Sequence, residues 1–250
     1  TQEPVSSSLF PVEYDNDLKI RWSKNHDDDF MRYNIYQSRS IAMESKVTVK
    51  KLDQRQDTLY VLPMNSVYYY QIGVEDYWGL ESLSNVVKGD FNVQIWGLDY
   101  SLIETKELNL SSKKIFGEIS REIGELVNLE ILRLHINFLS GTIPDEIWKL
   151  EKLKILNLSE NKLSGEIPSG IHKLVQLEEL WLGDNNLSGK LPYQIFILKY
   201  LTHLNISDNE ISGNISESIG NLENLVYLNL WDNNISGFIP RELGELSKLE

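Results

Sequence analysis

The chain has 250 residues, a net charge of −13 and no cysteine, which excludes disulfides, thiolate zinc sites and cysteine nucleophiles. The acidic balance argues against nucleic acid as a partner, because binding it requires a basic surface. No run of 18 apolar residues is present, so no segment is expected to span a membrane, and the length favours two domains.

Residues 1–88 are predicted to form an all-β domain. Short apolar runs rich in aromatic and β-branched residues alternate with turn signals, and no helical periodicity of any length appears. The predicted strands lie near residues 18–22, 33–35, 47–49, 58–62, 68–74 and 86–87. About seven strands in fewer than 95 residues is typical of a β-sandwich.

Several motifs of this domain resemble those of fibronectin type III domains. Trp22 matches the core tryptophan of the second strand, and residues 33–36 (YNIY) match the family's Y-x-V-Y strand. Residues 62–68 (LPMNSVY) match its tyrosine corner, and residues 74–82 match a V-x-A-x-D-x-x-G-x-E-S stretch. The resemblance implies an immunoglobulin-like sandwich in which Tyr68 has a structural role. No Arg-Gly-Asp tripeptide is present, so that family's adhesive motif is not carried over.

Three consecutive acids, Asp27, Asp28 and Asp29, fall in a predicted loop of this domain. They lack the alternating spacing of a calcium-binding loop, because neighbouring side chains point in different directions. A solvated loop is therefore favoured over a metal site.

Residues 89–104 are predicted to join the two domains. Gly89 and Asp90 end the last strand, and the following Phe91, Val93, Ile95 and Trp96 are too apolar for a free linker. We interpret this segment as the N-terminal cap of the next domain, which makes the connection short and fairly stiff.

Residues 105–250 repeat one 24-residue pattern. The segment 129–152, LEILRLHINFLSGTIPDEIWKLEK, recurs from Leu153, Leu177, Leu201 and Leu225, and a less regular copy begins near Thr105. Self-similarity at a fixed period predicts a solenoid of about six stacked coils.

Each recurrent position of the repeat has a predicted structural role. The L-x-L motif forms one short strand with inward leucines, and stacked copies form a parallel sheet. Glycine follows where the backbone needs special freedom, and Ile-Pro favours extended geometry on the convex side, before a short helical turn. One asparagine of each copy is expected to satisfy turn backbones of its own and the next coil. These asparagines form the Asn ladder: Asn137, Asn161, Asn185, Asn209 and Asn233.

This pattern resembles the leucine-rich repeat family, in its 24-residue plant-type subclass. The cap of plant receptors carries paired cysteines around W-x-G-V, whereas Trp96-Gly97-Leu98 stands here without them. Together with the fibronectin-like domain, this departure favours a bacterial surface or secreted protein over a plant receptor ectodomain. The chain stops at Glu250 without a visible C-terminal cap, which predicts a piece of a longer protein.

Ligands are expected on the concave sheet, where the side chains between the strand leucines face solvent. Large aromatics at such positions suggest an interface, since burial does not explain them. Four acids of one column would lie about 4.8 Å apart and repel one another, which suits a basic partner, although acids tolerated in a solvated turn are the favoured explanation. The predicted binding residues are Arg133, His135, Glu160, Glu179, Trp181, Asp184, His203, Asp208, Tyr227, Trp231 and Asp232.

Catalysis finds little support in the sequence. His203, Ser207 and Asp208 share one strand region and cannot converge as a triad. No cofactor and no catalytic residue is predicted. The favoured function is a non-enzymatic, extracellular or cell-surface module that binds a protein or peptide. The alternatives are a carbohydrate-binding adhesin, a fragment of a plant-type receptor ectodomain, or a scaffold without a specific ligand.

Overall fold

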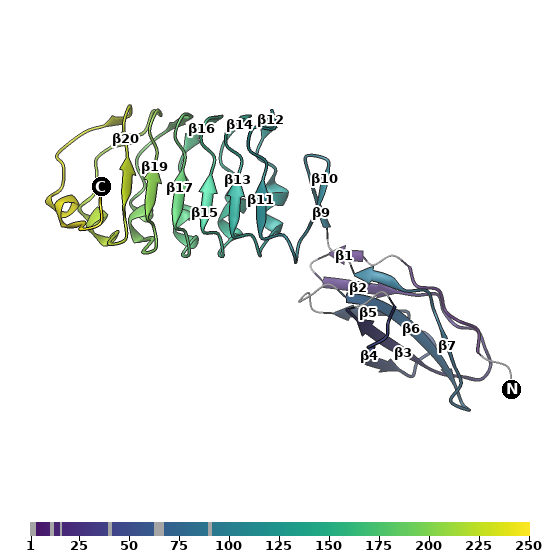
Figure 1. Cartoon of the computed structure of the whole chain (residues 1–250). Coiled ribbons are helices and arrows are strands. Elements are labelled where there is room, and N and C mark those ends of the chain that lie inside the picture. Colours follow the sequence, from purple (N-terminus) through teal and green to yellow (C-terminus); the bar gives the residue numbers. More distant parts are fainter. Residues whose placement is uncertain (1–3, 11–12, 16, 40–41, 63–67, 90–91) are drawn as a thin grey trace. The chain divides into compact units, whose positions relative to one another are not determined.

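The computed structural model of the chain describes residues 4–10, 13–15, 17–39, 42–62, 68–89 and 92–250. The contacts divide the chain into two compact units, Thr1–Phe91 and Asn92–Glu250. The described residues of the first unit form strands, turns and loops, and the second unit repeats one coil of strand, turn and short 3-10 helix (Figure 1).

Two antiparallel sheets build the first unit. The smaller sheet has the order β1-β2-β5, and the larger has the order β4-β3-β6-β7, with β8 pairing with β6. The strands are β1 (Glu13–Asp15), β2 (Asp17–Arg21), β3 (Phe30–Ser38), β4 (Val47–Leu52), β5 (Leu59–Leu62), β6 (Tyr68–Asp76), β7 (Glu81–Leu83) and β8 (Val87–Gly89). The short strands β1 and β7 were not anticipated, because three residues carry too little alternation to detect.

Aromatic side chains join the two sheets of the first unit. Trp22, just after β2, is almost fully buried and meets Tyr33 of β3 edge-on, with ring centroids 5.4 Å apart. The Tyr33 hydroxyl accepts a hydrogen bond from the Asn25 backbone N–H at 2.7 Å. On β6, the alternating Ile72 and Val74 are completely buried, as their period of two predicts.

Part of the fibronectin-like pattern lies outside the described residues. This applies to residues 63–67 of the predicted tyrosine corner and to the side chain of Tyr68. In the predicted acidic loop, Asp27 accepts hydrogen bonds from the backbone N–H of Val5 and from the side chain of Asn25. This carboxylate therefore has a structural role within the loop.

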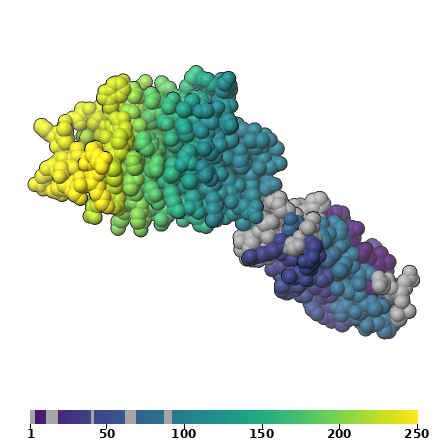
Figure 2. All heavy atoms as spheres, viewed as in Figure 1, coloured from purple at the N-terminus to yellow at the C-terminus, as the bar shows by residue number. Residues whose placement is uncertain are grey.

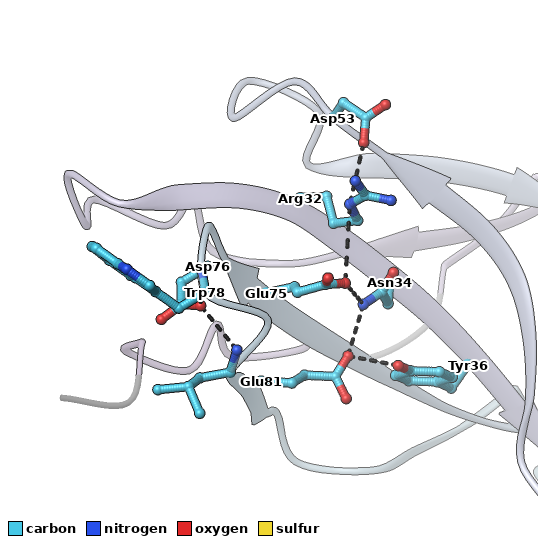
Figure 3. Close-up of polar contacts among 9 residues, drawn as sticks. Arg32, Asn34, Tyr36, Asp53, Glu75, Asp76, Trp78 and Glu81 are labelled. Carbon is cyan, nitrogen blue, oxygen red and sulfur yellow. Dashed lines mark hydrogen bonds and ion pairs between the residues drawn. The ribbon is translucent and has the colours of Figure 1, made fainter. Parts of the chain in front are cut away.

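A polar network crosses the larger sheet (Figure 3). The Asn34 amide donates to Glu75 at 2.9 Å and to Glu81 at 2.8 Å, and the Tyr36 hydroxyl donates to Glu81 at 2.6 Å. Glu81 reaches these partners by folding over Gly73, where an added Cβ would lie 2.0 Å from its carboxylate oxygen. Burial raises the pKa of the Tyr36 phenol well above its usual range, and the hydrogen bond and charge of Glu81 raise it further.

The second unit begins with a hairpin of β9 (Asn92–Ile95) and β10 (Leu98–Ser101). Trp96 and Gly97 form its two-residue turn with φ of 47° and 78°, the left-handed geometry that matches the twist of paired strands. Ile95 is fully buried, and β9 lies against the first 3-10 helix, η1 (Arg121–Glu125). The hairpin therefore belongs to the same compact unit as the coils.

Six parallel strands form the main sheet of the second unit, one from each coil and in strict register. Figure 1 shows these strands side by side, and in Figure 2 the coils appear as adjacent bands from teal to yellow. The strands are β11 (Glu107–Asn109), β13 (Ile131–Arg133), β15 (Ile155–Asn157), β17 (Glu179–Trp181), β19 (His203–Asn205) and β21 (Tyr227–Asn229).

Short 3-10 helices follow on the other side of each coil, as the sequence predicts. In the first five helices an isoleucine and the leucine that follows the helix point into the core, so that Ile147 and Leu150, for example, are fully buried. The remaining helices are η2 (Asp145–Lys149), η3 (Ser169–Lys173), η4 (Tyr193–Ile197), η5 (Glu217–Asn221) and η6 (Arg241–Glu245).

A second set of parallel strands follows the ladder asparagines and was not predicted. The repeated glycine lies in these segments with φ between 78° and 94°, which an L side chain rarely adopts. The extended geometry expected at Ile-Pro is present at Pro144, with φ of −71° and ψ of 144°, but the paired strands that precede it were missed. The strands are β12 (Phe116–Glu118), β14 (Phe138–Gly141), β16 (Lys162–Glu166), β18 (Asn186–Ser188), β20 (Ser212–Gly213) and β22 (Asn234–Ile235).

The Asn ladder connects each coil to the one before it. The amide nitrogen of Asn161 donates to the carbonyl oxygen of Leu134 in the preceding coil and to those of Leu158 and Ser159 in its own coil. Its oxygen accepts from the backbone N–H of Leu139, also in the preceding coil. The sequence analysis expected bonds to the following coil, and this was wrong: the asparagine points back along the stack.

We predict that Asn161→Ala destabilises the repeat unit by roughly 3 kcal/mol, because backbone groups in the interior of the stack lose their partners. Calorimetry of the full chain is expected to show the transition of the repeat unit at lower temperature and that of the first unit unchanged. Asn214→Ala is the control, since the exposed Asn214 amide makes only a 3.4 Å contact with the adjacent carbonyl. Equal effects of the two substitutions would contradict the prediction.

The raised pKa of Tyr36 gives a prediction about pH. Above about pH 10 the unfolded chain loses the phenol proton while the folded chain keeps it, so the first unit loses stability as the pH rises. Tyr36→Phe should weaken this dependence, because phenylalanine does not titrate. Urea unfolding of both chains between pH 8 and 11 measures it. An identical alkaline loss of stability in the two chains would show that Tyr36 is not responsible.

Candidate functional site

The candidate site lies on the solvent face of the six-stranded sheet, which we call the sheet face. In each L-x-L strand the leucine points into the core, as Leu156 and Leu180 do, and its neighbours point outward. Each coil has four outward positions. Two lie immediately before and after the first leucine of the L-x-L motif, and the other two lie in the turn that follows the strand. The sheet face therefore consists of side chains that packing leaves free.

Three rings form an aromatic cluster on neighbouring strands: Trp181 of β17, His203 of β19 and Tyr227 of β21. Their centroids are 5.7 Å apart for Trp181–His203 and Trp181–Tyr227, and 6.1 Å apart for His203–Tyr227. The planes are inclined by 28–30° to one another. The strand register pairs His203 with Tyr227. It pairs Trp181 with Asn205, so the Trp181 ring extends sideways from this position to contact the other two rings. Tyr227 is 37% exposed, so the cluster faces solvent.

Hydrogen bonds hold two members of the aromatic cluster. The indole N–H of Trp181 donates to the Glu179 carboxylate at 2.8 Å. The Thr202 hydroxyl donates to the Glu178 carbonyl at 2.9 Å and also lies 2.9 Å from Nδ1 of His203. Since the hydroxyl proton is used on Glu178, Nδ1 of His203 is the donor in the second contact. These bonds orient the rings before any ligand arrives.

An acidic row runs beside the cluster, in the turns that follow the strands: Glu160, Asp184, Asp208 and Asp232. All four residues have left-handed backbones with φ between 49° and 56°. Aspartate and asparagine tolerate this conformation better than most residues, although Ile136 adopts it at the equivalent position of the coil of β13, with φ of 57°. The sequence analysis did not identify this constraint.

The acidic row is electrostatically strained at its centre. The backbone N–H of Asp184 donates to the Ser207 carbonyl, and that of Asp208 to the Trp231 carbonyl, so the turns stack in register. Partial burial raises the pKa of the Asp208 carboxyl, and the neighbouring charges of Asp184 and Asp232 raise it further. The Asp208 carboxyl therefore binds a proton more readily than an ordinary aspartate does.

Arg133 and His135 lie on the coil of β13, two strands away from Trp181. The Arg133 guanidinium forms an ion pair with Glu107, with Nη1 and Oε1 2.7 Å apart. Nδ1 of His135 is buried and has no hydrogen-bond partner among the described residues, and burial lowers the pKa of this imidazole. These two predicted site residues are therefore not brought together with the aromatic cluster.

Trp231 lies in the turn after β21 and is 68% exposed. Its backbone N–H donates to the side chain of Asn229 at 3.1 Å, while its indole projects from the structure. Asn157 and Asn205, at the same strand position as Asn229, accept equivalent bonds from Ser159 and Ser207. The asparagine oxygens on the sheet face are thus occupied by the backbone.

One exposed aromatic pair was missed by the sequence analysis. Phe116 and Phe138 stack on the adjacent sheet of β12 and β14, with ring centroids 4.7 Å apart, and Lys162 lies over Phe138. Phe116 is 69% exposed. The signal was available, since each phenylalanine stands just before a leucine or glycine of the repeat, outside the core pattern.

Within the described ranges, no group of three or more His, Cys, Asp or Glu residues could hold a metal ion. Ser207 is buried, so its hydroxyl is not presented to solvent beside His203. None of the helices described is both long and apolar enough to cross a membrane.

Comparisons with known proteins place these features in a family. Leucine rich repeat models match residues 127–187, 200–222 and 224–246. No curated protein matches the chain.

The solved structures that resemble the chain include plant receptors. The plant peptide hormone receptor RGFR1 in complex with RGF2 is 37% identical with a TM-score of 0.56, over 58% of this chain and 23% of the receptor. The complex PEPR1–AtPEP1 is 37% identical with a TM-score of 0.57, over 58% of this chain and 20% of that chain. The chain thus spans less than a quarter of either length.

The ectodomain of the Arabidopsis thaliana receptor kinase SOBIR1 is similar in size to the repeat unit. It is 34% identical, with a TM-score of 0.51, over 53% of this chain and 72% of that chain. The register of the strands, the Asn ladder, the family models and this coverage agree, and the chain belongs to the leucine-rich repeat family.

Proposed function

We propose that the chain is a non-enzymatic recognition module that binds a protein or peptide on the sheet face, outside the cell or at its surface. The observation that carries this proposal is a group of aromatic side chains at outward positions, the partly exposed Trp181 and the exposed Tyr227 and Trp231, on a sheet whose other outward positions are mostly small or polar. Exposed aromatics of this kind are enriched in the hot spots of protein interfaces.

Rigidity of the sheet face supports the same proposal. Its strands are paired in register on both sides from β13 to β19, and the Asn ladder fixes the turns behind them. A surface that is already ordered loses little conformational freedom on binding. One of the structures similar to this chain, RGFR1 in complex with RGF2, is described as a plant peptide hormone receptor, which is consistent with a peptide ligand here.

The role proposed for the first unit is that of a fibronectin type III-like module placed before the solenoid. Its two sheets, the buried Trp22 and the buried Tyr33 support this assignment. The domain limits proposed from the sequence, 1–88, 89–104 and 105–250, differ slightly from the compact units, which divide between Phe91 and Asn92. In this proposal the hairpin of β9 and β10 caps the first coil.

A carbohydrate ligand is the second candidate function. The rings of the aromatic cluster are within 30° of parallel, and sugars stack on exposed aromatic faces. Two observations favour a protein ligand instead. A neutral sugar would leave the charges of the acidic row unrelieved, and the asparagine oxygens beside the cluster already accept backbone hydrogen bonds.

We predict that Trp181→Ala combined with Trp231→Ala lowers the affinity for selected peptides at least tenfold. Peptides would be selected from a random 12-residue display library on the full chain and measured by calorimetric titration. Loss of two hot-spot aromatics makes the free energy of binding less favourable by about 2–4 kcal/mol. This exceeds the roughly 1.4 kcal/mol that corresponds to a tenfold change in affinity. The expected result is a loss of binding without a change in the unfolding transitions.

The control for this experiment is Trp78→Ala, which removes a tryptophan from the first unit. Trp78 is 66% exposed, close to the 68% of Trp231. It should leave affinity unchanged. Peptides that bind the double variant as tightly as the unmodified chain would remove the sheet face from consideration. Binding of glycans from an array, with no peptide enriched by selection, would support the second candidate function.

A further inference from the structure

The sheet face of the last four complete coils carries acidic side chains and no lysine or arginine. Of the outward positions on β15, β17, β19 and β21 and in the turns after them, five carry carboxylates and none carries lysine or arginine. The carboxylates are those of the acidic row together with Glu179. At the outward positions of the preceding coil, the one cation from lysine or arginine is Arg133 on β13, which forms an ion pair with Glu107.

The backbone explains the shape of the acidic row but not its charge. Left-handed φ is compatible with asparagine as well as aspartate, and Ser112 occupies the equivalent position of the first coil with φ of 57°. Uncharged side chains would therefore satisfy the turn without repulsion between coils. The negative charge is an additional property of this face, and like charges on neighbouring coils repel one another.

The aromatic cluster and Trp231 lie beside these charges. Glu179 is bound to the Trp181 indole at 2.8 Å, and Trp231 immediately precedes Asp232 in the same turn. An aromatic face next to a carboxylate is the environment that a guanidinium prefers, because its plane stacks on the ring while its edge donates to oxygen. A lysine ammonium would gain the charge attraction but less of the stacking.

We propose that the partner of the sheet face is a basic, arginine-containing peptide segment, with guanidinium groups placed between the exposed aromatic rings and the acidic row. This inference rests on the proposed function, since it names the chemical class of the ligand for the same surface. The ligand lies across β17, β19 and β21, and its cations relieve the repulsion among Asp184, Asp208 and Asp232.

The decisive variant is Asp184→Asn combined with Asp208→Asn. Asparagine retains the left-handed turn and the size of the side chain, so the coil is expected to fold unchanged. The control, Glu118→Gln combined with Glu166→Gln, removes the same charge from exposed positions on the strands β12 and β16, away from the sheet face. Calorimetry of each full-length variant verifies that both unfolding transitions persist.

Random 12-residue peptides would be selected in parallel on the unmodified chain, on the double asparagine variant and on the control. We expect arginine to be enriched in the pools from the unmodified chain and the control, and not in the pool from the asparagine variant. Individual arginine peptides should bind the asparagine variant at least tenfold more weakly. Their affinity for the unmodified chain should fall as salt is raised, because exposed charges are screened.

The outcomes separate this inference from the proposed function. Selected peptides that need Trp181 and Trp231, but show no excess of arginine and bind the asparagine variant equally well, would overturn the basic ligand and leave peptide recognition standing. Lysine enriched to the same degree as arginine would overturn the stacked guanidinium. Selected peptides whose affinity does not depend on Trp181 and Trp231 would overturn both the arginine-containing ligand and the proposed function.

Discussion

Hydrogen bonding of the turn backbone is the constraint on which the repeat unit depends. Each coil turns out of its strand inside the stack, where backbone N–H and C=O groups cannot reach water and must find partners in the protein. The ladder asparagine supplies these partners, since one side chain both donates and accepts. Asn185, for example, donates to the carbonyl of Leu158 and accepts from the N–H of Leu163, both in the preceding coil. The register of the strands and the alignment of the turns follow from this connection.

This constraint also determines where specificity can reside. The leucines, the ladder asparagine and the glycine have fixed roles in the coil, so they recur along the chain. The outward positions are free to differ, and it is there that Trp181, His203 and Tyr227 meet on three neighbouring strands. The turn before the ladder asparagine is an intermediate case, because its left-handed backbone restricts the choice of residue without prescribing a charge. The proposed recognition therefore involves a small minority of the residues in each repeat.

The aromatic cluster and the acidic row have different physical roles in the proposed recognition. The rings offer a preorganised surface, oriented by Glu179 and Thr202, whose burial by a partner is favourable. The carboxylates repel one another and favour a partner that carries positive charge. In the polar network of the first unit, by contrast, the carboxylates of Glu75 and Glu81 accept the hydrogen bonds of Asn34 and Tyr36 within the sheet.

Period and spacing in the sequence were sufficient to predict the solenoid, the inward leucines, the ladder positions and the outward columns, because a coil repeated every 24 residues must place equivalent residues alike. The alternation of residues 68–74 was likewise sufficient for a strand. Other features depend on contacts between coils that no single repeat contains. The backward direction of the ladder bonds, the second set of strands, the pairing of Arg133 with Glu107 and the meeting of Trp181 with Tyr227 are of this kind. A sequence column places a side chain on a face, but its rotamer and its neighbours two strands away are decided only when the coils are stacked.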